Sequence, residues 1–272
     1  MKKQTAISFF DGTGIIKAAI GVFILGGAVH SANAAIIEVD YSSLSGIAGA
    51  NFEDLGLGPN EQVTFDAIFE SGNTSFGESF AGQTVTTSGD FDVLTGSPTG
   101  PLTLVPGGAV TNITAVDGGA GDVGNTAIAG SGPDGYPAAS AVGEGSIAIL
   151  FDFDQSEFGF DIVGPNFGSA TAQFWARDGS LIDEINFALG GSVFESFGFV
   201  TDDASFSVAG VSIFNNDPGG IGFDNFIFNV EGVPGTPGDG GTPVPEPSSL
   251  GLLGLGLVAL VYRQRRLPSR PA

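Results

Sequence analysis

The sequence predicts an all-β protein: an antiparallel β-sandwich with a jelly-roll-like topology of eight to ten strands. Apolar and polar residues alternate with a period of two over many short segments, as in strands with one buried face. Glycine is frequent, 45 residues in 272, and supplies turns between short strands. All of the 24 phenylalanines except Phe9, Phe10 and Phe23 lie beyond residue 35, where they can fill the space between two sheets.

A signal helix is predicted over residues 1–34. Basic residues, among them Lys17, precede an apolar run at 18–29, and Ala32 and Ala34 follow it with the A-x-A spacing of a signal peptidase site. We expect cleavage after Ala34. The apolar run is also shorter than the ~20 residues of a permanent membrane span.

Four stretches of the body, residues 35–231, show the strand alternation most clearly. An apolar shared face predicts a side turned to the core. The residues predicted to share faces are Val63, Phe65, Ala67 and Phe69; Ile147, Ile149, Phe151 and Phe153; Phe158, Phe160 and Ile162; and Asp224, Phe226, Phe228 and Val230. The Gly- and Asp-rich segment 118–139 is predicted to be the longest loop.

The dipeptide Asp178-Gly179 predicts a type I′ hairpin turn between segments 174–177 and 180–187. Arg177 precedes this turn and is the only basic residue between positions 35 and 247. We expect it to form an ion pair across the hairpin. The candidate partners are Asp183 and Glu184.

Residues 232–245 read as a Pro/Gly linker, and residues 246–272 as a tail with a short transmembrane helix and a basic cluster. The apolar run Leu250–Tyr262, with the residues from Pro247, would span ~20–24 Å of a ~30 Å bilayer core. The arginines after it are expected to stay cytoplasmic. The motif residues are Val244, Pro245, Glu246, Pro247, Arg263, Arg265 and Arg266.

This tail resembles a PEP-CTERM sorting tail: a Pro-Glu-Pro motif, a short span and basic residues in that order at the end of the chain. The resemblance implies that an exosortase-type transpeptidase recognises the tail and cuts near the motif. It also implies export in a Gram-negative bacterium, through a transient inner-membrane intermediate, to the cell surface or extracellular matrix. Such bacteria often make the exopolysaccharide of a biofilm.

Charge and composition exclude several classes of function. Between residues 35 and 247, 29 acidic residues and one arginine give a net charge of −28, which repels nucleic acid. The chain has no cysteine, and its single histidine, His30, lies in the signal peptide, so the mature protein would lack the commonest catalytic base. The acidity has three interpretations: solubility of an exported protein, Ca²⁺ binding, or repulsion between neighbours in a matrix.

Segments 51–55, 151–161 and 222–228 resemble the exported sandwich domains that often accompany PEP-CTERM tails, which are similar to lectin-like jelly rolls and carbohydrate-binding modules. The resemblance implies a Ca²⁺ between an early acidic residue and an aspartate near the last strand, here Glu53 and Asp224. A solvated acidic surface is the other interpretation. The candidate Ca²⁺ ligands are Glu53, Asp54, Asp217, Asp224 and Asn225.

Tyr136 and Trp175 are candidate platforms for a sugar, although either side chain can equally belong to the packed interior. We predict a non-catalytic surface or matrix protein that binds polysaccharide with Ca²⁺. The alternative is a polysaccharide-active enzyme with a carboxylate pair. The acids considered for such a pair are Glu144, Glu157, Asp161 and Glu195.

Overall fold

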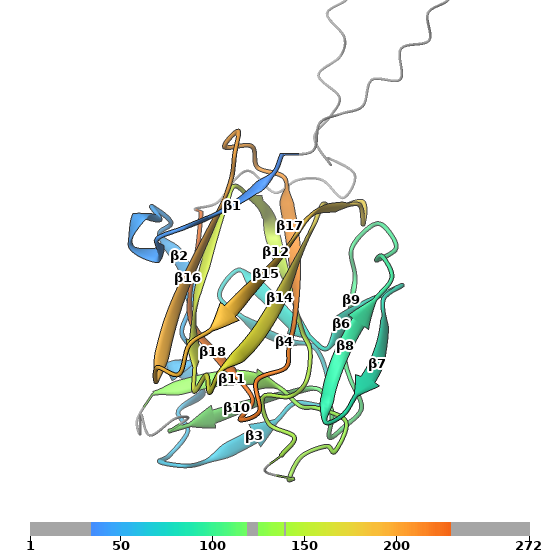
Figure 1. Cartoon of the computed structure of the whole chain (residues 1–272), viewed down its shortest axis with the longest axis vertical. Helices are drawn as coiled ribbons and strands as arrows, with labels where there is room; N and C mark the ends of the chain where they lie inside the picture. The colour runs from blue at the N-terminus through green and yellow to red at the C-terminus, as the bar shows by residue number, and fades with distance from the viewer. Residues whose placement is uncertain (1–33, 119–124, 139, 230–272) are drawn as a thin grey trace, which may run out of the picture. The chain divides into compact units, whose positions relative to one another are not determined.

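Two antiparallel sheets face each other in the computed structural model, which describes residues 34–118, 125–138 and 140–229 (Figure 1). The eight-stranded sheet has the order β1 (Ile36–Val39), β16 (Phe194–Thr201), β13 (Glu157–Val163), β18 (Gly222–Phe228), β11 (Thr126–Gly130), β10 (Ile113–Asp117) and β3 (Gln62–Thr64), with β2 (Ala48–Ala50) beside β18. The six-stranded sheet has the order β15 (Leu181–Leu189), β14 (Gly168–Trp175), β17 (Val208–Asn215), β12 (Ile147–Gln155), β5 (Thr74–Gly77) and β4 (Phe69–Ser71). The prediction of an all-β sandwich is confirmed, with more strands than expected.

Phenylalanine rings fill the space between the two sheets. Phe160, which is fully buried on β13, lies at the centre of this core. Its ring centroid is 5.3–6.4 Å from those of Phe158, Phe187, Phe197, Phe199, Phe223 and Phe226. The inward faces predicted from Ile147 and from Phe158 are confirmed for Ile147, Ile149 and Phe151 and for Phe158, Phe160 and Ile162, which are all buried. Phe153, predicted on the first of these faces, is only half-buried, and the pairing of β12 with β17 is irregular between Leu150 and Gln155.

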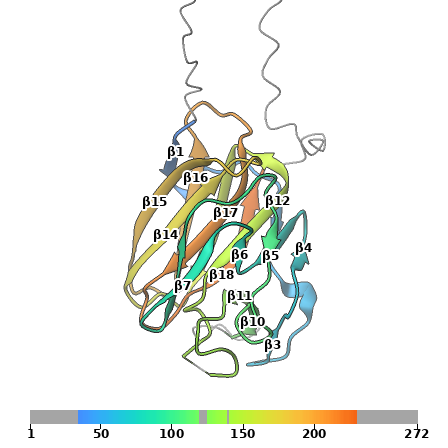
Figure 2. The same ribbon diagram turned by 90° about the vertical axis from the view of Figure 1, so that its right-hand side faces the viewer.

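A third layer covers the outer face of the six-stranded sheet. It consists of the pair β6 (Ser79–Phe80) and β9 (Leu104–Val105) and the hairpin β7 (Thr84–Ser88) and β8 (Phe91–Thr95) (Figure 2). Phe80 and Leu102 pack there against Trp175 in a second apolar cluster. The Gln83 amide Nε2 donates to Gln173 Oε1 (3.0 Å) and Ser212 Oγ (3.1 Å), which fixes this layer to β14 and β17.

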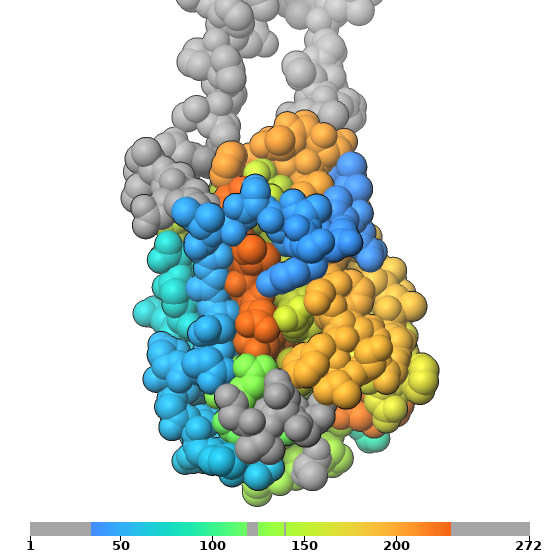
Figure 3. Space-filling model, turned by 90° about the vertical axis from the view of Figure 1, so that its left-hand side faces the viewer, coloured from blue at the N-terminus to red at the C-terminus, as the bar shows by residue number. Residues whose placement is uncertain are grey.

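The N-terminal segment crosses the eight-stranded sheet beside β18 (Figure 3). Tyr41 lies over Gly159 on the outer face, β2 pairs with β18, and Phe52 enters the core between the sheets. It contains two short 3₁₀ helices, η1 (Tyr41–Ser43) and η2 (Glu53–Leu55). The Tyr41 hydroxyl donates to the Asn225 carbonyl (2.6 Å), and Ser45 donates to the Glu157 carboxylate from its N–H (3.1 Å) and its hydroxyl (2.9 Å). These bonds hold η1 on β13 and β18.

The hairpin predicted at Asp178-Gly179 is present, but the turn type was predicted wrongly. Only Gly179 has positive φ (+84°), whereas a type I′ turn needs it at both central residues. The Gly179 N–H donates to the Ala176 carbonyl (2.9 Å), and the Ala176 N–H donates to the Ser180 carbonyl (2.9 Å). The loop therefore has three residues, ends in a left-handed glycine and places Arg177 in the turn.

The predicted partners of Arg177 are also wrong. Its guanidinium pairs with Asp154 on β12, with Nη2 to Oδ1 at 2.7 Å, and Nη2 also donates to the Phe151 carbonyl (3.0 Å). As a turn residue, Arg177 reaches across the six-stranded sheet rather than along its own hairpin. Burial raises the pKa of Asp154, and the charge of Arg177 and its hydrogen bond lower it.

Two predicted boundaries also differ from the structure. Segment 63–69 is not one strand: β3 ends at Thr64 and β4 begins at Phe69 in the other sheet. The Asn112 side chain donates hydrogen bonds to the Phe65 (3.0 Å) and Ala67 (2.8 Å) carbonyls. This side chain therefore helps to hold the segment that passes from one sheet to the other. The predicted loop 118–139 contains β11, a buried strand of Thr, Ala, Ile and Gly.

The signal segment, the linker and the sorting tail lie outside the described residues, so their boundaries stay predictions. Within residues 34–118, 125–138 and 140–229, no helix has the length and apolar character of a membrane span.

Candidate functional site

A bulge in β18 positions Asp224. Asp161 of β13 pairs with Asp224, and Gly159 pairs with Ile227, so Asn225 and Phe226 together oppose Phe160 alone. Asn225 takes up the extra residue with φ +47°. The bulge turns both Phe223 and Phe226 into the core. The predicted alternation over 224–230 is therefore wrong, because Asp224 and Phe226 do not share a face.

Asp224 is fully buried, and neither of its carboxylate oxygens has a hydrogen-bond partner of good geometry. The pKa of Asp224 is raised to about 6, mainly by burial and further by the charges of Glu53 and Asp161. Hydrogen bonds from the Asn225 N–H and the Asn125 side chain lower this pKa in part. An ionised carboxylate in this position is unfavourable unless a proton or a cation neutralises it.

Glu53 comes from η2, far from Asp224 in sequence, and lies close enough to act on the pKa of that residue. Its Oε1 accepts a hydrogen bond from the Thr126 N–H (2.8 Å), which ties η2 to the start of β11. Asp161 accepts hydrogen bonds from the side chains of Asn225 and Ser196. Burial raises the pKa of Tyr41, and Asp161 and Asp224 add to the shift, so all these groups share one acidic neighbourhood.

The other predicted Ca²⁺ ligands occupy different positions. Asp54 is exposed on η2. Asp217 is buried in the loop between β17 and β18, where its carboxylate accepts from the N–H groups of Asn166 and Gly219. Asn225 is exposed and donates to Asp161. In the part of the chain that the structure describes, no three acidic side chains come close enough together to hold a metal ion.

A second group of acids lies under the hairpin of β7 and β8, and two of its members escaped the sequence analysis. Asp92 is buried on β8, and its Oδ2 accepts from the Ser146 N–H (3.3 Å). Burial raises the pKa of Glu78 and of Glu144 to about 7 and that of Asp92 to about 6. The charge of Asp92 adds to the shift of Glu78. Asp92 lies two residues before the buried Leu94 and therefore points to the same side of β8. This alternation was visible in the sequence and could have indicated that Asp92 is buried.

The two sugar-platform candidates lie in different surroundings. Trp175 is 1% exposed and donates from Nε1 to Ser212 Oγ (2.9 Å), so the interior position, which the sequence analysis also allowed, is the one that it occupies. Its ring offers no face to a ligand. Tyr136 is half-buried in the loop after β11, and its N–H donates to the Val110 carbonyl (2.7 Å).

Of the acids considered for catalysis, Glu157 and Asp161 lie on β13, Glu195 lies on β16, and Glu144 precedes β12. Glu157 accepts from Ser45, and Glu195 accepts from the Gly190 N–H (2.9 Å). Glu144 is buried, and its Oε2 has no hydrogen-bond partner. The carboxylate-pair enzyme stays a prediction.

The tail decides the sorting question. Residues 243–266 match the family model described as the PEP-CTERM protein-sorting motif. The chain carries a PEP-CTERM sorting motif. All seven predicted motif residues, from Val244 to Arg266, fall inside the match, which confirms the resemblance seen in the sequence. A PEP-CTERM tail marks a chain for export through an exosortase system with a membrane-anchored intermediate.

Comparisons of the whole chain add little about function. No curated protein matches the sequence. One similar structure is the enzymatically active domain of tailspike protein 4 of bacteriophage CBA120, with 14% identity, 63% of this chain and 19% of that chain covered, and a TM-score of 0.24. Another is CsCBM6-3 of Clostridium stercorarium in complex with cellobiose, with 11% identity, 63% and 95% covered, and a TM-score of 0.25. Such low TM-scores carry no argument about what this PEP-CTERM chain binds.

Proposed function

We propose that this chain is an exported, non-catalytic protein of the cell surface or extracellular matrix of a Gram-negative bacterium, where it binds polysaccharide and Ca²⁺. The PEP-CTERM motif is the observation that carries the proposal. The charge of −28 between residues 35 and 247 suits a protein that stays soluble outside the cell and avoids nucleic acid.

Processing by the exosortase system is tested by replacing Pro245, Glu246 and Pro247 with alanine. We expect the wild-type protein outside the inner membrane without its tail, and the variant held in the membrane fraction with its tail intact. Immunoblots against both ends of the chain, in cells with and without the exosortase gene, measure this. A matched control replaces Pro234 and Pro237 in the linker and should be processed normally. Intact wild-type protein in the cytosol would contradict the proposal.

The Ca²⁺ part of the proposal rests on Asp224. Its two oxygens are buried without a hydrogen-bond partner of good geometry, and the charge of Glu53 acts on its pKa. Carboxylate oxygens are ligands that Ca²⁺ prefers, and it completes a set of six to eight with carbonyl groups and water. Asp224 and Glu53 would supply the charge, and the bound ion would remove the cost of burying Asp224 as an anion.

Addition of Ca²⁺ to the chelator-treated protein should therefore raise its melting temperature. At 100 times the dissociation constant the expected gain is about 2.7 kcal/mol, or roughly 5–10 °C for a domain of this size. Asp224→Asn should abolish the shift and stabilise the metal-free protein. Asp54→Asn, which alters an exposed acid beside Glu53, should keep the shift. Equal melting temperatures with and without Ca²⁺ in the wild type would remove the ion from the proposal and leave the sorting intact.

A further inference from the structure

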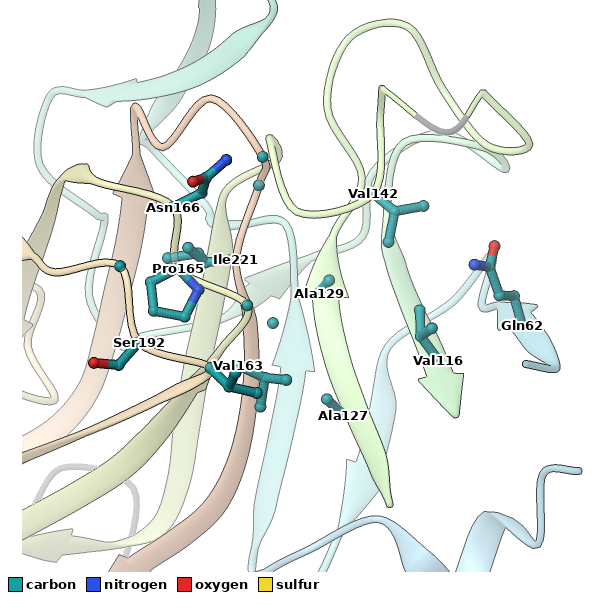
Figure 4. Close-up of a pocket in the computed structure, with 16 residues that line it drawn as sticks. Gln62, Val116, Ala127, Ala129, Val142, Val163, Pro165, Asn166, Ser192 and Ile221 are labelled. Atoms are coloured by element: carbon teal, nitrogen blue, oxygen red, sulfur yellow. The ribbon is translucent and has the colours of Figure 1, made fainter. Parts of the chain in front are cut away.

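A groove of about 500 Å³ crosses the outer face of the eight-stranded sheet where β13 ends and β16 begins (Figure 4). Its floor includes Val116, Ala127 and Val163, which lie on the opposite side of their strands from the core residues Ala115, Ile128 and Ile162. The loops after β13, β15 and β17 form its wall. Val142, from the loop after β11, also lines it, so the groove is built by five strands and four loops that are far apart in sequence.

None of the side chains that line the groove is charged. The surrounding domain carries one arginine and more than twenty acids, so an uncharged surface of this size stands out on it. The polar side chains of the lining are the amides of Gln62 and Asn166 and the hydroxyl of Ser192. Figure 4 shows Asn166 and Ser192 on one side of the groove and Gln62 on the other. Amides both donate and accept hydrogen bonds, and apolar walls with a few such groups are typical of sites for neutral ligands.

An exposed aromatic ring stands beside this wall. Phe167 follows Asn166 directly, is 64% exposed and has φ +77°, an outlier for a bulky residue. A Cβ atom on Gly191, which lines the groove, would lie 2.7 Å from the Phe167 ring, so the ring rests on that backbone and needs a glycine there. Val193, also in the lining, is 52% exposed. A strained backbone that holds an apolar ring in water gives the fold nothing, and such strain gathers at binding sites.

The loop that carries Phe167 is held firmly. The buried Asp217 carboxylate accepts from the Asn166 N–H, and Asn216 Oδ1 accepts from the Ser169 N–H (2.7 Å). The Asp217 N–H in turn donates to Asn215 Oδ1 (2.9 Å). These bonds fix the backbone on both sides of Phe167. The ring is thus pre-positioned, which lowers the entropy cost of binding.

We propose that this groove binds a segment of a neutral polysaccharide, with the Phe167 ring packed against the apolar face of one sugar and Asn166, Ser192 and Gln62 bonded to hydroxyl groups. The inference deepens the proposed function and rests on it. An anionic glycan is disfavoured because the acidic domain repels it. A second copy of the chain is disfavoured for the same reason, since both partners carry the same large negative charge.

Affinity gel electrophoresis of the protein released by wild-type cells tests the inference, with dextran, galactomannan and xyloglucan as neutral probes and alginate as an anionic one. We expect at least one neutral probe to slow migration. Phe167→Ala should weaken the apparent affinity by about tenfold or more. Phe167→Gly should lose binding equally while its melting temperature is unchanged or higher, because glycine relieves the positive φ. Loss of binding without loss of stability separates a ligand contact from a structural one.

Phe206→Ala is the matched control. Phe206 is also an exposed ring (54%), but it lies in the loop after Thr201, at the other end of β16 from the groove. The Phe206→Ala variant should bind the neutral polysaccharides as tightly as the wild type does. Migration unaffected by every neutral probe would overturn the inference, although the protein could still be exported and processed. Three other results would overturn the inference as well. The first is that Phe167→Ala is retarded as strongly as the wild type, and the second is that alginate alone retards the protein. The third is a dimer, seen in sedimentation, that the Phe167→Ala substitution dissociates.

Discussion

Phe160→Ala is expected to destabilise the domain by about 3–5 kcal/mol, because a buried phenylalanine loses its transfer free energy and leaves a cavity. The loss should be at the upper end of that range, since rings from both sheets surround Phe160 and cannot all move inward. For a domain of this size the melting temperature should fall by roughly 10 °C or more. Urea unfolding measured by the fluorescence of Trp175, the only tryptophan, gives the free energy directly.

Phe206→Ala removes the same side chain from an exposed position and should change stability by less than about 0.5 kcal/mol. If both variants lost the same stability, the central position of Phe160 in the core would be wrong.

The second large effect is a dependence of stability on pH that is opposite to that of most acidic proteins. The pKa values of Glu78, Asp92 and Glu144 are raised to about 6–7, so the folded state binds protons that the unfolded state releases. The stability that these groups contribute should be complete below their unfolded pKa values of 3.8 to 4.5 and should be lost as the pH rises to their folded values of about 6 to 7. Asp224 adds to this trend in the absence of a cation.

Asp92→Asn isolates one part of this effect. One pKa unit corresponds to about 1.4 kcal/mol, and after an allowance for solvent screening we expect a gain of about 1–2 kcal/mol at pH 8 and a much smaller one near the unfolded pKa of 3.8. The amide oxygen can still accept from the Ser146 N–H. Asp152→Asn, on the exposed side of β12, should change stability little at either pH. A wild type that becomes more stable between pH 5 and 8 in chelator would contradict the raised pKa values.

Alternation alone predicted the core of this fold well. In segments 147–151 and 158–162 one face is apolar without interruption, and a shift by one residue would turn every ring away from the core between the two sheets, so the sequence specifies the register strongly. The strand β11 was missed because its small side chains resemble a loop composition. The third layer was missed because nothing local shows that Trp175 and Ala148 are covered by Phe80, Leu102 and Leu104, which lie more than forty positions away in sequence.

The candidate site was predictable only in part. Resemblance brought Glu53 and Asp224 to attention, and the structure places them in one neighbourhood. The bulge at Asn225 that turns Asp224 away from the core left a trace in the spacing of Phe223 and Phe226, which are three residues apart on a strand. The groove could not be recognised in the sequence, because its lining comes from separate strands and loops and contains no charged residue and no motif.

The register of β1, β13 and β16 places the two ends of the described chain side by side. Ile36 pairs with Thr201, Glu157 pairs with Val200, and Asn229 Oδ1 accepts from the Ser156 and Glu157 N–H groups, so the domain is entered and left at one end. The groove floor at Val163 lies at the opposite end of β13 from Glu157, about 20 Å away. The described chain thus ends at Asn229 on the side remote from the groove, and a cut in the sequence beyond Asn229 would remove none of the residues that line it.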